Sequence, residues 1–352
     1  MANLWADTPD YYGTTQIPLI WTNITAMVVS SNNGRRTSTN ALAFNALPSD
    51  VSKTLAPGDA TIGVAFGIKF TTAATARRNF FMIGDATVVH LTMSQQLDGT
   101  ILWRLGGSLL TDNGTTIGAT TWAPSIGVYY HFSILATINN TTGALSFKVN
   151  GSEQLNGGSG YTNIDTQNGG TAGWTRFGFA RDGATPNQYI CDFVVNDGTS
   201  AVNNGHPGDC AVLVNIPNAV NGGNTGFTPN GGTFHGDRVR EIPLDDDTTY
   251  NASTASGQRD TYVFPSLALA SGTIKSVINR MALKLSEAGA ATAVGVMRDI
   301  SGATNYDSTV VHSPSDASYT YFDDLREQDP ATSSAWTVAG VNDTELGVKR
   351  AA

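Results

Sequence analysis

The chain has 352 residues, of which 40% are hydrophobic and 14% are charged, and its formal net charge at pH 7 is −9. This length is sufficient for two domains, the apolar fraction is too high for a disordered chain, and the negative charge argues against nucleic-acid binding, which relies on a basic surface. The 38 Gly residues, together with abundant Thr, Asn and Ser, are typical of strands joined by tight turns. We therefore expect an all-β protein.

The first 20 residues contain several aromatic side chains and show no clear period. Leu4, Trp5, Tyr11 and Tyr12 would be costly to leave in water, so residues 1–20 are predicted to form an arm that docks on a partner, with a free tail as the alternative. The N-terminus lacks a basic region followed by an apolar stretch, so we expect no signal peptide. No apolar run approaches the length of a membrane span, so we expect no membrane insertion.

Residues 21–214 contain a series of short segments in which apolar and polar or small residues alternate. In residues 61–70, large apolar side chains share one face, whereas the small residues Gly63, Ala65 and Gly67 share the other. This pattern predicts a central strand with another layer of structure close behind its small-residue face.

Residues 130–151 predict a β-hairpin, because two alternating runs flank a polar corner that contains Gly143. Asn150 and Gly151 follow as a second tight turn, and Asp98 with Gly99 forms another hairpin corner. Further strands are predicted at residues 80–83, 88–93, 101–105, 174–180 and 189–195. Strands at this spacing indicate a sandwich of two antiparallel sheets over residues 21–214.

Residues 215–240 are rich in Gly and Asn and predict a joint, after which residues 241–352 are expected to form a smaller second β-sandwich. Residues 274–285 fit either a strand or a helical stripe, and we interpret them as a strand because the surrounding pattern is β. Residues 337–342 predict one short helical turn with Thr337 as its N-cap. The other strand candidates of this domain are residues 261–264, 293–298, 319–325 and 345–348.

The sequence shows no set of residues that is typical of catalysis. A glycoside hydrolase needs two carboxylates facing one sugar bond, but Glu153 stands alone after a turn, and Asp192 is expected to point outward from its strand. The five His residues lie in no nucleophile context, and there is no nucleophile elbow, phosphate loop or dinucleotide fingerprint. We therefore predict no catalytic residue, with a glycan depolymerase as the enzymatic alternative.

Two kinds of ligand remain open at the level of sequence. Asp245, Asp246 and Asp247 could supply hard oxygen ligands to calcium, as could Asp197 with Asn203 and Asn204, although a plain acidic turn explains them as well. Sugar binding would use aromatic faces next to polar loops. Trp122 and Tyr161 lie near loops and are the predicted carbohydrate-binding residues, whereas Trp103 and Trp174 lie in strands and are expected in the core.

The chain has two cysteines, Cys191 and Cys210, and no cysteine–histidine cluster that would indicate zinc. They are interpreted either as two buried thiols or as a disulfide between neighbouring strands, which requires adjacent Cβ atoms.

The succession of TIGVAFGIKF, YHFSILATINNTTGALSFKVNG and YICDFVVNDGTSAVNN resembles a concanavalin-like, laminin-G-type jelly roll. From Ile190 onward the chain is similar to a family of tailed-bacteriophage virion proteins. The pieces that carry this resemblance are CDFVVNDGTSAVNNGHPGD, VNIPNAVNGGNTGFTPNGG, DDDTTYNASTASGQRDTYVF, IKSVINRMALK and EQDPATSSAWTVAGVNDTELGVK.

The resemblance implies a non-enzymatic structural protein of a virion, as part of a tail or collar fibre or of the capsid. It implies other virion proteins as partners and a homo-oligomer, for which a trimer is the expected state because fibres commonly have threefold symmetry. The alternatives are a receptor-binding module at a fibre tip that recognises a host-surface glycan, and a capsid decoration protein.

Overall fold

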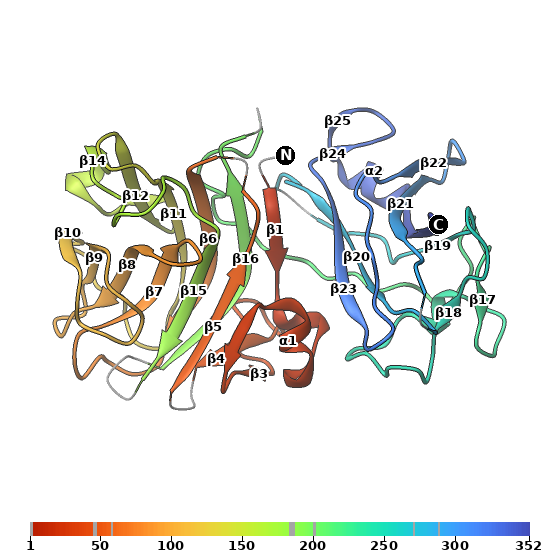
Figure 1. The fold of residues 1–352 in the computed structure, drawn as a ribbon, viewed down its shortest axis with the longest axis horizontal. Helices are drawn as coiled ribbons and strands as arrows, with labels where there is room; N and C mark the ends of the chain where they lie inside the picture. The colour runs from red at the N-terminus through yellow and green to blue at the C-terminus, as the bar shows by residue number, and fades with distance from the viewer. Residues whose placement is uncertain are drawn as a thin grey trace. The chain divides into compact units, whose positions relative to one another are not determined.

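The computed structural model describes residues 3–44, 48–57, 59–182, 187–199, 202–269, 272–287 and 289–352. The chain divides into two compact units, Met1–Leu213 and Val214–Ala352, and Figure 1 shows that strands dominate both. The helical segments among the described residues are single turns: α1 (Ile17–Ile20), α2 (Val338–Asn342), η1 (Pro9–Tyr11), η2 (Thr14–Gln16), η3 (Asn156–Gly158) and η4 (Gly236–Arg238). No helix in the described part of the chain is long and apolar enough to cross a membrane.

The first unit contains two large antiparallel sheets, called sheet A and sheet B here. Sheet A has the strand order β13-β12-β11-β6-β16-β4-β3, with β1 also paired to β16 and β14 also paired to β12. Its strands are β1 (Asn3–Asp7), β3 (Val28–Ser30), β4 (Ala41–Phe44), β6 (Thr61–Phe70), β11 (Tyr129–Thr137), β12 (Gly143–Val149), β13 (Ser152–Glu153), β14 (Tyr161–Ile164) and β16 (Gln188–Asp197).

Sheet B has the strand order β10-β9-β8-β7-β15-β5-β2. Its strands are β2 (Asn23–Thr25), β5 (Ser49–Thr54), β7 (Arg78–Gly84), β8 (Val89–Gln95), β9 (Ile101–Leu105), β10 (Thr115–Ala119) and β15 (Arg176–Arg181). Aromatic side chains from the two sheets meet between them. The ring centroids of Phe66 in sheet A and Phe179 in sheet B are 4.8 Å apart, and those of Phe147 and Trp103 are 5.7 Å apart.

The predicted central strand and hairpin are confirmed. Strand β6 runs over residues 61–70 as expected, and the hairpin strands β11 and β12 pair with Ile134 opposite Phe147. The small-residue face of β6 is covered closely, because a Cβ at Gly63 would lie 2.9 Å from the carbonyl oxygen of Gly205. The segment around Gly205 is therefore the layer that the small residues predicted.

The N-terminal segment belongs to the sandwich, so the prediction of a docking arm is wrong for its main aromatic residues. Strand β1 pairs with β16, and Trp5 and Tyr12 are only 3% and 2% exposed. Leu4 and Tyr11 are half-buried, and the hydroxyl group of Tyr11 donates to Asp7. The physical cost of exposing these side chains is avoided by packing within the unit.

The second unit has a four-stranded sheet of order β19-β26-β21-β22, a two-stranded sheet of β20 and β23, and two short ladders. Its strands are β17 (Thr228–Pro229), β18 (Asn251–Ala252), β19 (Arg259–Tyr262), β20 (Val277–Leu283), β21 (Ala293–Asp299), β22 (Thr304–Asp307), β23 (Thr320–Arg326), β24 (Gln328–Asp329), β25 (Ser334–Ala335) and β26 (Thr344–Arg350). Residues 214–240 form part of this unit; for example, the amide of Asn218 donates to the carbonyl oxygen of Val263 at 2.8 Å.

The two sheets of the second unit share a small core. Met281 of β20 clusters with Ala293 and Val348, which belong to the four-stranded sheet, and the side-chain amide of Asn279 donates to the carbonyl oxygen of Gly347 at 2.6 Å. The interpretation of residues 274–285 as a strand is confirmed by β20. The N-cap prediction is also confirmed, because the side chain of Thr337 accepts a hydrogen bond from the amide of Gly340. The chain is thus an all-β protein with a jelly-roll sandwich followed by a smaller β-sandwich.

Candidate binding site

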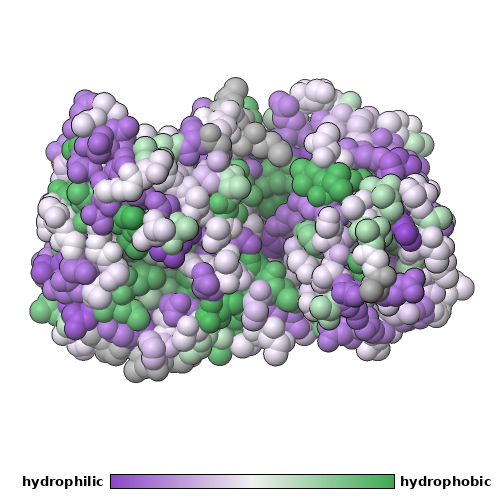
Figure 2. Space-filling view, viewed as in Figure 1, coloured by the Kyte–Doolittle hydropathy of each residue, from purple (hydrophilic) through white to green (hydrophobic). Residues whose placement is uncertain are grey.

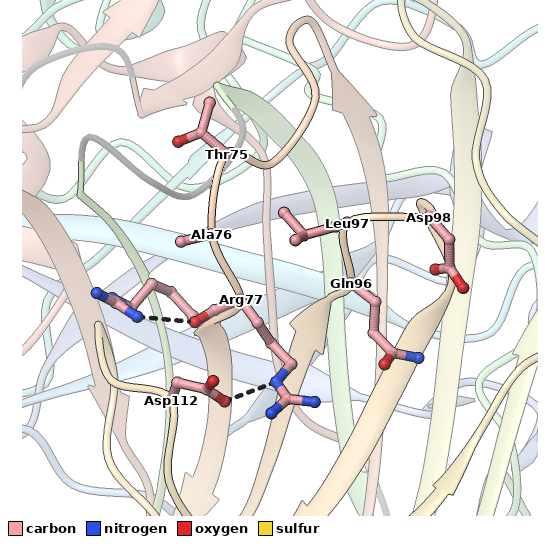
Figure 3. Close-up of a pocket in the computed structure, with 8 residues that line it drawn as sticks. Thr75, Ala76, Arg77, Gln96, Leu97, Asp98 and Asp112 are labelled. Atoms are coloured by element: carbon pink, nitrogen blue, oxygen red, sulfur yellow. Dashed lines mark hydrogen bonds and ion pairs between the residues drawn. The ribbon is translucent and has the colours of Figure 1, made fainter.

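An open pocket of about 480 Å³ lies at one end of sheet B. Three stretches of chain form it: the approach to β7, the turn between β8 and β9, and the loop that follows β9. Its lining residues are Thr75, Ala76, Arg77, Arg78, Gln96, Leu97, Asp98 and Asp112. Figure 3 shows Arg77 and Asp112 on one side, with Gln96, Leu97 and Asp98 on the facing turn. A cavity of this size lies within the range of small-molecule sites.

One wall of the pocket is held by an ion-pair cluster. The Arg77 Nε atom lies 2.7 Å from Asp112 Oδ1, and Asp112 also pairs with the buried guanidinium group of Arg104. Arg104 in turn donates to the carbonyl oxygen of Asn113 at 3.0 Å. The hydrogen bond from Arg77 lowers the pKa of Asp112, so this carboxylate stays charged and its position is fixed.

The facing wall is the predicted Asp98-Gly99 corner. Asp98 Oδ1 accepts hydrogen bonds from the amide and the hydroxyl group of Thr100 at 2.9 and 2.7 Å, and these bonds lower the pKa of Asp98. Gly99 has a φ of +89°, which favours glycine at this corner. The side chain of Leu97, 70% exposed, projects from the turn.

The pocket therefore combines guanidinium and amide donors, carboxylate acceptors and an exposed apolar side chain. Fixed polar groups of both kinds beside an apolar surface suit a polyhydroxylated ligand such as a sugar. Sequence reasoning did not identify this site, although the Asp98-Gly99 corner was recognised. The sequence does contain the adjacent pair Arg77-Arg78, but a basic pair alone does not predict a pocket. The pocket becomes visible only in the fold, which places Asp112 next to Arg77.

The aromatic residues predicted to bind carbohydrate do not line this pocket. Trp122 is half-buried and packs edge-on against Tyr130, with ring centroids 4.8 Å apart. Tyr161 is also half-buried, and its hydroxyl group would lie 2.3 Å from a Cβ at Gly118. Both side chains are thus engaged in packing within the unit. Trp103 and Trp174 lie in the core as expected, at 0% and 2% exposure.

Of the two interpretations of the cysteines, the disulfide is not formed, because both residues are thiols. Cys191 is buried on β16, where burial raises the pKa of its thiol to about 12. Cys210 instead donates to the carbonyl oxygen of Pro207 at 3.0 Å. Cys191 and the side chain of Arg35 lie over the same glycine, Gly67, and Arg35 reaches the carbonyl oxygen of Cys210 at 2.7 Å. Each thiol therefore has its own contacts, and the two sulfur atoms do not form a disulfide.

The predicted calcium ligands are engaged by different neighbours. Asp247 pairs with Lys284 Nζ at 2.6 Å, whereas Asp245 accepts the hydroxyl group of Thr249 at 2.9 Å. Asp246 occupies the turn between them with a φ of +57°. Within the described ranges, no group of three or more acidic, His or Cys side chains is arranged to hold a metal ion.

Asp192 was expected to point into solvent, and this expectation is wrong. The pairing of β16 with β6 shifts register between Cys191 and Val194, and Asp192 adopts a φ of +52° at this bulge. Its carboxylate is 1% exposed and lies 3.3 Å from Arg35 Nε and 2.9 Å from Arg36 Nη2. Asp192 lies on the outer face of sheet A, and it is buried because Arg35, Arg36 and the backbone at Val212 cover its carboxylate.

Neither a protein-family model nor a curated protein matches this chain. Solved structures resemble it distantly. A sialidase matches at 13% identity with a TM-score of 0.39, over 56% of this chain and 19% of the sialidase. A Trypanosoma rangeli sialidase matches at 14% identity with a TM-score of 0.31, over 48% of this chain and 27% of its own. The globular domain of T. cruzi calreticulin matches at 10% identity with a TM-score of 0.34, over 55% of this chain and 88% of that domain.

The chain thus spans about a fifth to a quarter of the length of the sialidases it resembles. At these TM-scores the likenesses carry no argument about activity. The class of protein is defined by its own topology, as an antiparallel β-sandwich protein with a jelly-roll first unit.

Proposed function

We propose that this protein is a non-enzymatic structural component of a tailed-bacteriophage virion, placed on a tail or collar fibre or on the capsid, where it serves attachment. The sequence resemblance from Ile190 onward supports the virion assignment. The short edges of both sheets support a role at high local concentration. Sheet A ends in strands of two and three residues, and one end of sheet B is a strand of three. Short edge strands limit unwanted pairing between neighbouring copies.

The observation that carries the attachment role is the open pocket between Arg77 and Leu97. Its charged groups are held by ion pairs and hydrogen bonds before any ligand arrives, so little ordering is required on binding. A host-surface glycan is the ligand class that such mixed polar and apolar groups suit. In this role the glycan is bound and remains intact.

The charges in the pocket favour binding over glycan cleavage. A glycosidase needs one carboxylic acid with a raised pKa that can protonate the leaving oxygen. The pKa values of Asp98 and Asp112 are both lowered by hydrogen bonds from their own neighbours. The alternative of a depolymerase would therefore require other residues.

The proposed partners are other virion proteins and further copies of this chain, with a trimer as the proposed state. A capsid decoration protein is the second candidate within the same class. Mass spectrometry of purified particles, with localisation by cryo-electron microscopy, tests both: we expect the protein in the particle at a multiple of three copies. Its absence from purified particles would contradict the virion proposal.

Attachment is tested by the binding of the purified protein to host cells and to a glycan array. We expect Arg77→Ala and Leu97→Ala each to weaken binding at least fivefold. Ile126→Ala is the matched control for Leu97→Ala, because Ile126 is an exposed apolar residue (48%) of the same unit outside the pocket. Equal binding by all variants would place attachment elsewhere, and release of reducing sugar by the wild-type protein would favour the depolymerase alternative.

A further inference from the structure

The segment that leads from the first unit into the second lies flat on the outer face of sheet A. We call residues 203–213 the strap. The strap begins beside β16, where the side-chain amide of Asn196 donates to the carbonyl oxygen of Gly205 at 3.0 Å. Near its end, the amide of Val212 donates to the buried carboxylate of Asp192 at 3.0 Å. Residues 203–213 contain no strand, and side-chain contacts fasten the strap to sheet A.

One attachment is a histidine that bridges two strands. His206 Nδ1 lies 3.0 Å from the hydroxyl oxygen of Ser133 on β11, and His206 Nε2 lies 2.6 Å from that of Ser146 on β12. The hydroxyl group of Ser146 donates to Glu153. Because that proton is committed to Glu153, Ser146 accepts from Nε2–H, and Nδ1 is left to accept from Ser133. This arrangement uses the neutral imidazole.

The second attachment is ionic. Arg35 pairs with Asp209 of the strap and donates to the carbonyl oxygen of Cys210 at 2.7 Å. Arg36 donates to the carbonyl oxygen of Val212 at 2.7 Å. Asp192 of β16 forms ion pairs with both guanidinium groups. The two arginines therefore connect the strap to β16.

A second histidine lies on the same outer face. His131 is two residues before Ser133 on β11 and is 1% exposed, and neither of its ring nitrogens has a hydrogen-bond partner. The charged groups that act on it are Asp209 of the strap and Arg35. For His206, the charged neighbours are Lys148 on β12 and Glu153 on β13.

We propose that the strap is an acid-sensitive latch, which stays on sheet A while His206 and His131 are neutral and detaches when they are protonated. With the strap closed the His131 ring is buried and the His206 ring is half-buried, and water would solvate their charged forms once the strap opens. Burial lowers the pKa of each histidine to about 4, below the usual value near 6.5. A lowered histidine pKa means that the closed state loses stability as the pH falls from about 6.5 towards 4.

Release of the latch would free the strap from sheet A. The eleven residues of the strap, counted from 203 to 213, would span up to about 36 Å when extended, at roughly 3.3 Å per residue.

Cys191 provides a reporter for this event, because it is 1% exposed on the same face and Arg35 lies against it. In a Cys210→Ser background, we expect 4,4′-dithiodipyridine to label Cys191 at least tenfold faster at pH 4.5 than at pH 7.5, relative to a small thiol at each pH. Tryptophan fluorescence should stay constant over this range, since Trp103 and Trp174 lie in the core. Equal relative rates, or labelling that coincides with a fluorescence change from global unfolding, would overturn the proposal.

Histidine variants test whether the pH dependence of Cys191 labelling comes from His206. His206→Gln keeps a neutral hydrogen-bonding side chain, and we expect it to move the midpoint of labelling to lower pH. His312→Gln is the control, because burial also lowers the pKa of His312 but it lies in the second unit, and its midpoint should equal that of the wild type. If His206→Gln does not fold, hydrogen exchange of the wild-type protein decides: backbone amides of residues 203–213 should lose protection at pH 4.5 while those of β8 keep theirs. Equal loss in both segments, or in neither, would refute the latch.

Discussion

The interiors of the two units are stabilised by different kinds of side chain. In the first unit the core is aromatic: the largest fully buried side chains of the described chain all belong to it, namely Trp21, Trp103, Trp174, Phe44, Phe66, Phe70, Phe80, Phe81, Phe132, Phe147, Phe177 and Phe179. In the second unit the clustered apolar core is small, and three partly buried residues complete it: Phe227, Leu283 and Phe322. Apolar burial therefore stabilises the first unit in a way that the second cannot match.

In the second unit, buried polar networks add to the stabilisation that the small apolar core provides. Asp260 is fully buried and accepts hydrogen bonds from the hydroxyl group of Tyr262 at 2.8 Å and the side-chain amide of Asn251 at 3.1 Å, with His235 Nδ1 at 2.7 Å. On the sheet surface, Asp307 bridges Arg259 and a lysine of β26. Figure 2 shows hydrophilic side chains over much of the visible face, including the part of the first unit that carries β12 and β14. The difference between the units lies in how their interiors are built.

The aromatic core is tested by Phe66→Ala. Phe66 is fully buried and contacts rings of both sheets, so its truncation should destabilise the first unit by about 3–5 kcal/mol. Denaturation followed by tryptophan fluorescence reports on this unit, particularly after Trp336→Phe removes the signal of the second unit. Ile126→Ala, at a residue of the same unit that is 48% exposed, should change stability by less than about 0.5 kcal/mol. A similar cost for both variants would contradict the packing model.

The polar network of the second unit is tested by Asp260→Ala. Its removal leaves the buried groups of His235, Tyr262 and Asn251 without their shared acceptor, and we expect a loss of about 2–3 kcal/mol. Trp336 is buried in this unit and provides the fluorescence signal. Asp316→Ala removes an exposed carboxylate and should have little effect. If the two variants were equally stable, the buried network would contribute nothing to this unit.

The comparison also explains which features could be predicted from the sequence. Strand β6 and the β11–β12 hairpin were recognisable because each alternates over its own length, and every inward position is apolar. The N-terminal segment shows the limit of this reasoning. Its aromatic residues correctly indicated burial, but the sequence does not name the partner, which is β16 of the same unit.

Features that depend on distant segments were missed. Asp192 was assigned to solvent by strand parity, and the alternation gives no sign that Arg35 and Arg36 cover its carboxylate. Arg35 and Asp209 are 174 residues apart in sequence, and the pocket gathers Arg77 and Asp112 from separate loops. Such juxtapositions depend on tertiary structure, and a charged residue in a loop looks the same whether it is solvated or paired.

The smallest expected effect concerns the surface ion pairs of the second unit. Asp307 lies 2.7 Å from Arg259 Nη2 and 2.7 Å from Lys349 Nζ, and the hydrogen bond from Arg259 lowers the pKa of Asp307. A lowered carboxylate pKa adds stability that is present above the ordinary Asp value near 3.9 and is lost as the pH falls through the folded-state value. Because these side chains are partly exposed, solvent screening limits the contribution to about 0.5–1 kcal/mol.

Asp307→Asn should therefore destabilise the second unit by that amount at pH 7, as followed by Trp336 fluorescence in urea. The difference from the wild type should shrink at high salt, because screening weakens the pair, and should also shrink as the pH falls through the lowered folded-state pKa of Asp307, because the wild-type carboxyl then becomes neutral. Asp260→Ala should keep most of its cost at high salt, since its partners are buried and hydrogen-bonded. If Asp307→Asn kept its full cost both at high salt and at low pH, the stabilisation would come from packing, and the interior of the second unit would resemble that of the first more closely than its charges indicate.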